Sequence, residues 1–459
     1  MKQWICVFLI FALVAGTVLS QEAEEKEKEA SQFEQRQEKI LFGLETEIVE
    51  LIDKVIDEED FEYGDDFYTL FNKTRSNSVR TKIIGYFEKT KDDRLKDFAA
   101  ELLEDPFEEN KEIVNAVFSY VSQVPVPQAL EPLRVLLESE DETFQIQTVK
   151  TLGKIGTEED AQNLRKFLDK EIQPGVKQAV IDALGDLGTS DSWDSLCEIL
   201  NDKAEDTYMR MHAVESLGKI DSDKAAGILV SLYDDKDANF RVSVIKGLAT
   251  SSDPEAQAVL IEALQDSYFR VRLEALEAIK NQKLSAAFKS LLYRAKNDSE
   301  NVVKYKAYET LAALGEKDGL DYLVSLVKSD KQTETTRGKA ATALLKYAFS
   351  ETLNPVIAVA ESTLNDEKQK KVRYALGKEF AKYESAALED ICLKYLENSD
   401  VATKGTGLDI YAKNAFPALT QNVEEIAKND KEGTNQKKAK YILEKLERAG
   451  RIVRSAPKD

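Results

Sequence analysis

Histidine and cysteine are scarce in this chain, and their scarcity limits its chemistry. His212 is the only histidine among 459 residues, and Cys197 and Cys392 are the only cysteines after Cys6. One histidine and two distant cysteines cannot form the usual ligand set of a zinc site. A Ser-His-Asp triad would depend on His212 alone, and no turn presents a serine nucleophile. The sequence therefore predicts a protein that is not an enzyme and that holds no metal or cofactor.

Proline and glycine are also few, with 9 and 20 residues respectively. These residues interrupt helices and form most tight turns. No stretch shows the sustained alternation of a strand, whereas apolar residues recur at helical spacing along the chain. The sequence therefore predicts an all-α protein.

Basic residues are outnumbered, with 63 Lys and Arg against 84 Asp and Glu and a formal charge of −21. Nucleic acid partners require a basic patch, so this charge argues against them. The charge is uneven, since residues 21–66 are strongly acidic and the chain from Lys428 onward is richer in Lys and Arg. A solvated helix surface is the common origin of such a basic end, and docking on an acidic surface is the alternative.

Long hydrophobic runs are absent after residue 20. Before it, Lys2, the run "WICVFLIFALVA" and the small residues of "GTVLS" are typical of a secretory signal peptide, with cleavage expected after Ser20. An uncleaved anchor is the alternative, but the run is short for a span of about 20 residues. We expect an exported chain, periplasmic or secreted, without stable membrane insertion after cleavage. Cys197 and Cys392 lie in helical apolar patterns and are expected to be free and buried.

Two short motifs resemble ligand sites only at first sight. "DKDANF" (235–240) begins like a calcium loop, yet Phe240 stands where glycine makes the turn and Lys246 where a bidentate Glu belongs. "GTG" (405–407) lacks the third glycine and the preceding strand of a dinucleotide motif. Neither predicts a site.

A twelve-residue pattern recurs along the chain. It reads "MRMHAVESLGKI" at 209–220, and similar copies are "VKQAVIDALGDL" (176–187) and "VRLEALEAIKNQ" (271–282). The ninth position serves as the anchor, and the steps between successive anchors are 32, 33, 31, 31, 32 and 33 residues: Leu152, Leu184, Leu217, Leu248, Ile279, Leu311 and Leu344. Weaker copies place anchors at Phe87, Tyr120, Leu376, Leu408 and approximately Tyr441. A repeat of this period predicts a solenoid of about twelve units.

Each unit predicts a helical hairpin. From Ala225, "AAGILVSLYDD" is the first helix, "KDAN" the turn and "FRVSVIKGLAT" the second helix. In the second helix, positions one, five, nine and twelve form one apolar face, and position six is apolar toward the neighbouring unit. One hairpin cannot bury both faces, whereas a stack can. The predicted fold is an all-α, right-handed α-solenoid over residues 75–450.

Position two of the second helix is basic in most units, and an Asp commonly lies a few residues ahead of the helix. We expect the acid to cap the helix and to pair with the cation of its own or the next unit. A basic ladder that binds an anionic ligand is the alternative. The basic residues are Lys177, Arg210, Arg241, Arg272, Lys304 and Arg337.

The pattern V-R-x-x-A-x-x-A-L-G resembles HEAT repeats. It is clearest at Val271-Arg272 and at Arg210, Leu217 and Gly218. The short step resembles the class found in phycobilisome lyases and deoxyhypusine hydroxylase, and the leader resembles exported or periplasmic bacterial HEAT-repeat proteins. The resemblance implies an armadillo-type scaffold for protein interaction. The His-Glu pairs of a deoxyhypusine hydroxylase cannot exist in a chain with one histidine.

The ends of the chain differ from the repeats. Residues 21–39 form an acidic, Glu/Lys-rich leader, either disordered or a solvated helix. Residues 40–74 are expected to be capping helices, and residues 451–459 a C-terminal tail.

The third position of the second helix is apolar in several units. It is a possible partner-binding stripe, because an exposed apolar row at repeat spacing suits an extended peptide or a helix. The interpretation we favour places these residues in the seam between units, since the apolar arc of the helix extends to them. The stripe consists of Ile146, Met211, Val242, Leu273 and Tyr305. His212, at the variable fourth position, is expected to face solvent or the rim.

These features predict an exported, non-enzymatic scaffold that binds a partner protein along its solenoid surface. One alternative is a lyase-like or ligand-modifying enzyme of the phycobilisome-lyase branch. Another is a structural component of the cell envelope whose acidic leader and basic C-terminal end mediate assembly.

Overall fold

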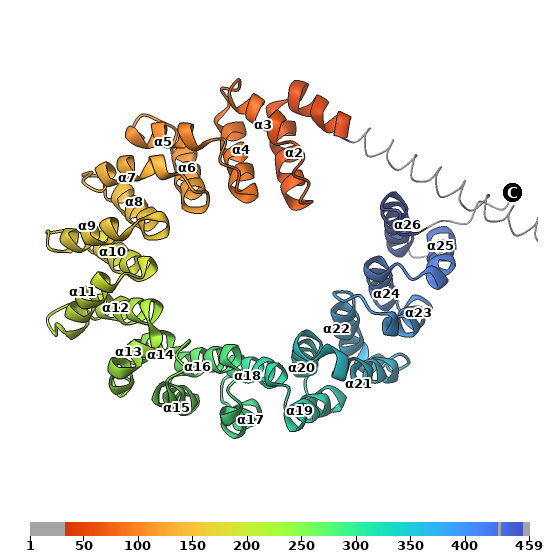
Figure 1. The fold of residues 1–459 in the computed structure, drawn as a ribbon. Coiled ribbons are helices and arrows are strands. Elements are labelled where there is room, and N and C mark those ends of the chain that lie inside the picture. Colours follow the sequence, from red (N-terminus) through yellow and green to blue (C-terminus); the bar gives the residue numbers. More distant parts are fainter. Residues whose placement is uncertain (1–32, 430–432, 453–459) are drawn as a thin grey trace, which may run out of the picture. The chain divides into compact units, whose positions relative to one another are not determined.

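The computed structural model describes residues 33–429 and 433–452, and all regular elements in these ranges are helices (Figure 1). This confirms the all-α solenoid of stacked hairpins. The predicted signal segment, residues 21–32 of the leader and residues 453–459 of the tail lie outside the described residues. No helix among the described residues is long and apolar enough to cross a membrane.

The chain divides into two compact units at Ala225 and Ala226, inside α13 (Ser222–Leu229). The first unit starts with a helix over residues 33–42 and α2 (Glu45–Asp57). Its hairpins follow in chain order: α3 (Gly64–Phe71) with α4 (Asn77–Thr90), α5 (Lys96–Glu104) with α6 (Lys111–Gln123), α7 (Leu130–Leu136) with α8 (Glu142–Ile155), α9 (Glu158–Leu168) with α10 (Pro174–Leu187), and α11 (Ser190–Asn201) with α12 (Thr207–Ile220).

The second unit continues with the same hairpin plan, some first helices carrying a short 3₁₀ turn. After α14 (Ala238–Leu248), its hairpins are α15 (Pro254–Glu262) with α16 (Phe269–Gln282), α17 (Phe288–Asn297) with α18 (Asn301–Leu314), α19 (Lys317–Lys328) with α20 (Glu334–Tyr347), α21 (Phe349–Ser362) with α22 (Lys370–Phe380), α23 (Glu389–Leu396) with α24 (Val401–Asn414), and α25 (Thr420–Asn429) with α26 (Gly433–Arg448).

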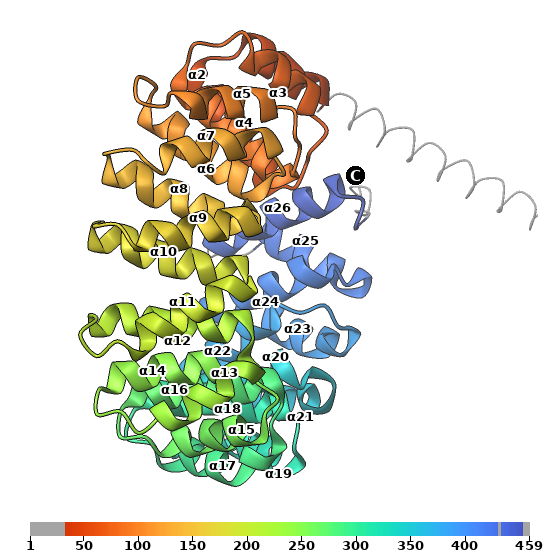
Figure 2. The same ribbon diagram turned by 60° about the vertical axis from the view of Figure 1, so that its left-hand side comes forward.

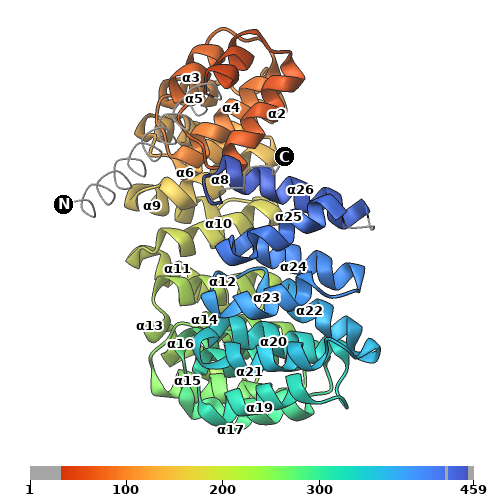
Figure 3. The same cartoon turned by 90° about the vertical axis from the view of Figure 1, so that its right-hand side faces the viewer.

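Within each unit the second helices pack side by side as an inner layer, and the first helices form the outer layer (Figures 1 and 2). Figure 3 shows the same arrangement for α16 to α26 of the second unit. The seven strong anchors, from Leu152 to Leu344, are at most 1% exposed. Position six is equally buried, with Val149, Ile181, Val214, Ile245 and Leu276 fully covered. Both predicted apolar faces are therefore used.

The second helices begin where short polar side chains cap them. Asp141, Asp206 and Asp237 accept hydrogen bonds from backbone N–H groups of the first helical turn of α8, α12 and α14. Ser76 caps α4 and Asp400 caps α24 in the same way. Such a cap satisfies N–H groups that have no partner inside the helix.

The predicted pairing of position-two cations with turn acids is confirmed in its clearest form in the second unit. Arg241 Nε and Nη2 donate to the two carboxylate oxygens of Asp266 at 2.8 and 2.9 Å. Arg272 contacts Asp298 of the next hairpin in the same way, at 2.9 and 2.8 Å. Each arginine also donates to the turn before its own helix, to Asp235 O and Asp266 O, both at 2.8 Å. We call each such arginine, with its carboxylate and carbonyl, a rung.

The remaining position-two residues have other partners. Lys177 pairs with Glu205 at 2.6 Å. Arg210 and Arg337 donate Nε to the carbonyl ten residues earlier, Leu200 O and Val327 O, at 2.9 and 2.8 Å. Lys304 forms no ion pair with any residue in the described part of the chain. Because Arg272 and Arg337 are 5% and 3% exposed, the series does not present a basic ladder to an anionic ligand.

Glycine at position ten brings neighbouring second helices of the first unit close together. A Cβ on Gly153 would lie 2.9 Å from Ala183 Cα, and a Cβ on Gly185 would lie 2.8 Å from Ser216 Cα. Real Cβ atoms do not approach a backbone this closely, so only glycine allows the helices this spacing. The glycine of the repeated Leu-Gly pair therefore permits the short distances between α8 and α10 and between α10 and α12.

Predicted anchors near the C-terminal end of the described chain need correction. In α24 the residue equivalent to Leu344 is the fully buried Tyr411 and not Leu408, although Leu408 is buried as well. Tyr441 is 65% exposed and is not an anchor, whereas Leu443 is buried in α26. In α22 the residue equivalent to Leu344 is Phe380, because Arg373 occupies the place that Arg337 holds in α20. The step there is longer than 33 residues because α21 has 14 residues and a 3₁₀ turn precedes α22.

The predicted boundary at residue 39 falls inside one continuous helix over residues 33–42. Phe33 stacks on Tyr63 at 5.2 Å, and Ile40 is 1% exposed. Arg36 is 6% exposed and pairs with Glu58 and Asp60. The described end of the leader is thus a packed helix, which its polar composition did not indicate.

Arg272→Met tests the rung. The side chain of Asp298 is 0% exposed, so removal of the guanidinium leaves a buried carboxylate without its main partner. We expect the free energy of unfolding to fall by about 3 kcal/mol, measured by chemical denaturation. Lys317→Met is the matched control, because Lys317 is 84% exposed in its pair with Asp321. It should cost less than about 0.5 kcal/mol, and equal losses in both variants would contradict the role of the rung.

Gly185→Ala tests the close approach of α10 and α12. The new Cβ would force the two helices apart, and we expect a loss of about 1 to 3 kcal/mol in the free energy of unfolding. Gly85→Ala in α4 is the control, because its Cβ would meet no atom within 4 Å. The control should be neutral or stabilising by up to about 1 kcal/mol. A stable Gly185→Ala protein would show that the spacing is not fixed by glycine.

Candidate interaction surface

The inner layer of second helices carries the position-three stripe. All five residues are half-buried; Ile146 and Met211 belong to the first unit, and Val242, Leu273 and Tyr305 to the second. Each helix thus offers solvent a partly exposed apolar side chain. Partner binding by these residues stays a prediction.

Part of the stripe also contributes to the seam between hairpins. Ile146 Cδ1 lies 3.3 Å from the place that a Cβ on Gly175 would occupy, so this side chain leans onto the next hairpin. The ring of Tyr305 lies 5.9 Å from that of Tyr308, which is 3% exposed. Of these two contacts, only that of Ile146 reaches another hairpin, because Tyr305 and Tyr308 both lie on α18. For the other stripe residues the seam interpretation stays a prediction.

In three hairpins the residue at position four contacts the hairpin before it. His212 Nδ1 lies 2.7 Å from Asp182 Oδ1, and Lys306 pairs with Glu277. Lys438 and Asp409 are related in the same way, at 2.7 Å. In these three pairs the side chain at position four is complementary in charge or hydrogen bonding to the acid at position seven of the preceding hairpin.

His212 is more than a residue at the rim. Its side chain is 18% exposed, and its ring packs edge-on against Tyr208 with centroids 4.5 Å apart. Together with the contact to Asp182, this makes it a link between α10 and α12. The partial exposure fits a residue at the rim, but one repeat, taken alone, does not show the contact with Asp182 of the neighbouring hairpin.

Charges on the inner layer largely neutralise one another. In the first unit Asp186 lies between Lys154 and Lys219, at 2.7 and 3.0 Å. Burial alone would raise the pKa of Asp186, yet the hydrogen bonds from the two lysines lower it below its usual value. In the second unit burial opposes, but Lys280 and Lys306 outweigh it and lower the pKa of Glu277 to about 2. This surface suits a mixed protein face better than a polyanion.

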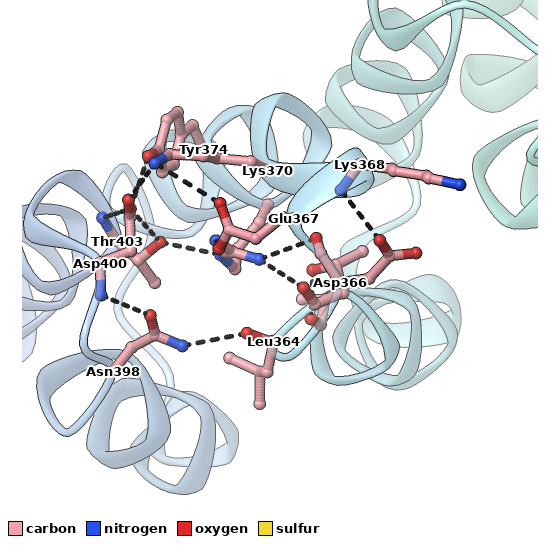
Figure 4. Close-up of polar contacts among 12 residues, drawn as sticks. Leu364, Asp366, Glu367, Lys368, Lys370, Tyr374, Asn398, Asp400 and Thr403 are labelled. Carbon is pink, nitrogen blue, oxygen red and sulfur yellow. Dashed lines mark hydrogen bonds and ion pairs between the residues drawn. The ribbon is translucent and has the colours of Figure 1, made fainter.

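Figure 4 shows the joint between α22 and α24 with Thr403, Asn398 and Asp400 labelled. This joint holds the most buried cation of the described chain, Arg373. Arg373 is 0% exposed, with Nε 2.8 Å from Thr403 Oγ1 and Nη1 2.5 Å from Thr363 O. The turn residue matching Asp298 is the neutral Asn398, which donates to Leu364 O at 3.2 Å. Nη2 of Arg373 has no hydrogen-bond partner among the described residues, although Glu367 lies 3.7 Å away. This rung therefore lacks its buried carboxylate.

Asp400 supplies the negative charge of this joint instead. It caps α24, accepts from Tyr374 Oη at 2.5 Å and pairs with Lys370 (Figure 4). Burial would raise the pKa of Asp400, but these hydrogen bonds and Lys370 hold it well below its usual range. The "VR" of "KVRYALG" at 371–377 was the signal that could have identified Arg373, and the choice of Leu376 as anchor concealed it.

A pocket of about 390 Å³ lies in the first unit beside the start of α3 and the end of α4. Phe61 and Tyr86 form its apolar wall, and burial, the main cause, raises the pKa of Tyr86 to about 12. Arg94 is already held by Asp65 and Asp92, at 2.5 and 2.9 Å. Arg94 is thus occupied within the protein, and the pocket lining does not define a ligand.

The described residues contain no group of three His, Cys, Asp or Glu side chains that could hold a metal ion. Cys197 and Cys392 are both free, as expected, though Cys197 is only half-buried. Burial raises the pKa of both thiols, that of Cys392 to about 12. Both thiols therefore stay protonated near neutral pH, which disfavours nucleophilic chemistry.

Comparison with known proteins identifies one family. A family model described as "Spirochaete HEAT repeat protein" matches residues 40–442. No curated protein matches the chain in sequence.

Solved structures similar to this chain are helical-repeat proteins of low sequence identity. The complex of CpcE and CpcF of phycocyanin lyase from Nostoc matches at 19% identity, covering 50% of this chain and 94% of the other, with a TM-score of 0.33. Human deoxyhypusine hydroxylase matches at 17% identity, covering 57% and 99%, with a TM-score of 0.28. Importin beta matches at 11% identity, covering 89% and 64%, with a TM-score of 0.41.

Proposed function

Because the chain belongs to the family of spirochaete HEAT repeat proteins, we propose that it is a non-enzymatic scaffold that binds a partner protein along its inner layer of helices. Solenoids of this class use such extended surfaces for binding. The observation that carries the proposal is the row of half-exposed apolar side chains among charges that are already paired. Such a surface offers apolar contact without an unbalanced field, which suits a protein segment.

The second unit gives the proposal a defined target. Leu273 lies on α16 and Tyr305 on α18, in adjacent hairpins whose second helices pack together. Their neighbours Glu277, Lys280 and Lys306 form a polar border around them. An apolar anchor inside a polar border is the usual anatomy of a protein interface.

The double variant Leu273→Asp and Tyr305→Asp tests this surface. We expect at least about a tenfold loss of affinity for the partner recovered with the native protein, because charged groups would replace the apolar anchors. Affinity is measured with the purified partner, and circular dichroism checks that helix content is retained. Tyr293→Asp is the matched control, since Tyr293 is 56% exposed on the outer helix α17. Equal binding by the wild type, the double variant and the control would show that the stripe is not the binding surface. Stoichiometric metal or chromophore in the purified protein would contradict the proposal of a non-enzymatic scaffold.

Export is the second part of the proposal. The pattern of residues 1–20 and the acidic mature chain support a periplasmic or secreted protein.

The N-terminus of the native protein tests this localisation. We expect the protein isolated from its own cells to begin at Gln21, because cleavage is predicted after Ser20. Peptide mass spectrometry of the envelope and soluble fractions measures it. A chain that begins at Met1, or one found only in the cytoplasmic fraction, would contradict export.

A further inference from the structure

The first described helix, residues 33–42, has one face packed on the first unit and one face with exposed side chains. Phe33, Arg36 and Ile40 point into the first unit, as their contacts and burial show. The opposite face carries the exposed acids Glu34 and Glu38. It continues into three large apolar residues at the end of this helix and in the turn before α2, which are exposed by 59, 84 and 70%: Leu41, Phe42 and Leu44.

The last described helix, α26, has an exposed face of opposite character. Asn435, Ala439, Ile442 and Leu443 are buried in its contacts with the hairpin before it. Tyr441 is 65% exposed on the other side. The lysines around it are exposed, and none of them pairs with a carboxylate among the described residues: Lys437, Lys440 and Lys445.

This face of α26 occupies the place where the next hairpin would pack. Interior second helices carry a buried apolar residue at position six, such as Val214 or Leu276, whereas α26 carries Lys440 there. The substitution fits a terminal repeat that faces water when it is alone. The face of α26 thus corresponds to the face by which interior second helices contact the next hairpin, but it carries a charge where those helices carry an apolar residue.

The two ends are complementary in charge and in apolar content. Residues 33–62 contain 11 acidic and three basic residues, and residues 433–452 contain six basic and two acidic ones. Phe42 and Leu41 on one face and Tyr441 on the other supply apolar groups at the centre of each charged surround. Complementary charges of this kind steer association, and central aromatic residues commonly carry the binding energy.

We propose that copies of this chain associate head to tail, with the N-terminal helix face of one copy bound to the α26 face of the next. A second copy is the occupant because the same chain carries both complementary faces, one at each end of its described length. A head-to-tail dimer still has one free N-terminal helix face and one free α26 face, so further copies can bind at both ends. This inference does not depend on the partner protein proposed above.

The wild-type mature chain gives the first measurement. Its weight-average mass, followed by sedimentation velocity over about a hundredfold range of concentration, should rise beyond that of a dimer. Raising the salt from about 20 mM to about 500 mM should weaken the association, because exposed charges are screened. A mass that stays monomeric at every concentration would overturn the proposal, and it is also the result expected if the two ends of one chain bind each other.

Complementary variants give the decisive measurement. Phe42→Asp blocks the head, and Lys437→Glu with Lys440→Glu blocks the tail; each should raise the dissociation constant at least about tenfold on its own. An equimolar mixture of the two should form dimers and stop there, because one intact head and one intact tail remain. Dimers of the tail variant alone would indicate head-to-head contact and contradict the proposal, as would a mixture that stays monomeric.

Matched controls lie on exposed outer helices. Val135→Asp is the control for the head, since Val135 is 70% exposed on α7. Lys289→Glu is the control for the tail, on the exposed face of α17. Both should assemble like the wild type, and loss of assembly in either would show that the effect is not specific to the two ends. Circular dichroism confirms that every variant retains its helices.

Discussion

The inability of a single hairpin to bury its own apolar faces is the constraint on which the molecule depends. Positions six and nine of the second helices from α8 to α18 are both buried, on two different faces, so a single hairpin cannot cover both and needs a neighbour. The residues that set the spacing follow from this requirement. Gly153 and Gly185 allow the second helices of the first unit to approach closely, and small residues opposite them, Ala183 and Ser216, accept that approach.

Apolar burial has no direction, and the polar contacts at the turns supply one. The Arg272–Asp298 rung forms with two parallel hydrogen bonds only at one register of α16 against the following turn. Desolvation makes such a pair costly if either partner is lost, and this cost disfavours other registers. The rungs and the position-four links, such as His212 with Asp182, therefore fix how successive hairpins meet, while the buried anchors hold them together.

Much of this could be predicted from the sequence because the repeat compares the chain with itself. A residue buried in one unit recurs in the next, which identified the anchors from Leu152 to Leu344 and the pairing of Arg241 and Arg272 with turn acids. Comparison between repeats misassigned residues where the length of the repeat changed. The longer α21 shifted the frame by four residues, so Leu376 replaced Phe380 as the anchor and Arg373 went unnoticed.

Contacts that occur once were also beyond the pattern. Arg36 lies in a segment whose composition indicates solvation, yet a carboxylate on either side of it allows burial. His212 is the only histidine of the repeat series, and its contact with Asp182 depends on the side chains of two adjacent hairpins. Of the candidate surface, the sequence identified the residues of the stripe, but not their partial burial or the self-neutralised charges around them, because both depend on side chains from adjacent hairpins.

Asp266 has a place in two rungs at once, since its carboxylate binds Arg241 and its carbonyl oxygen accepts from Arg272. The turns at Asp235, Asp266 and Asp298 are thereby joined into one chain of charge-assisted contacts along three successive hairpins. Opening the middle hairpin removes a partner from both of its neighbours. Under tension the hairpins from α14 to α18 should therefore unfold together. This part of the solenoid should resist extension more strongly than hairpins whose turns are not linked by rungs.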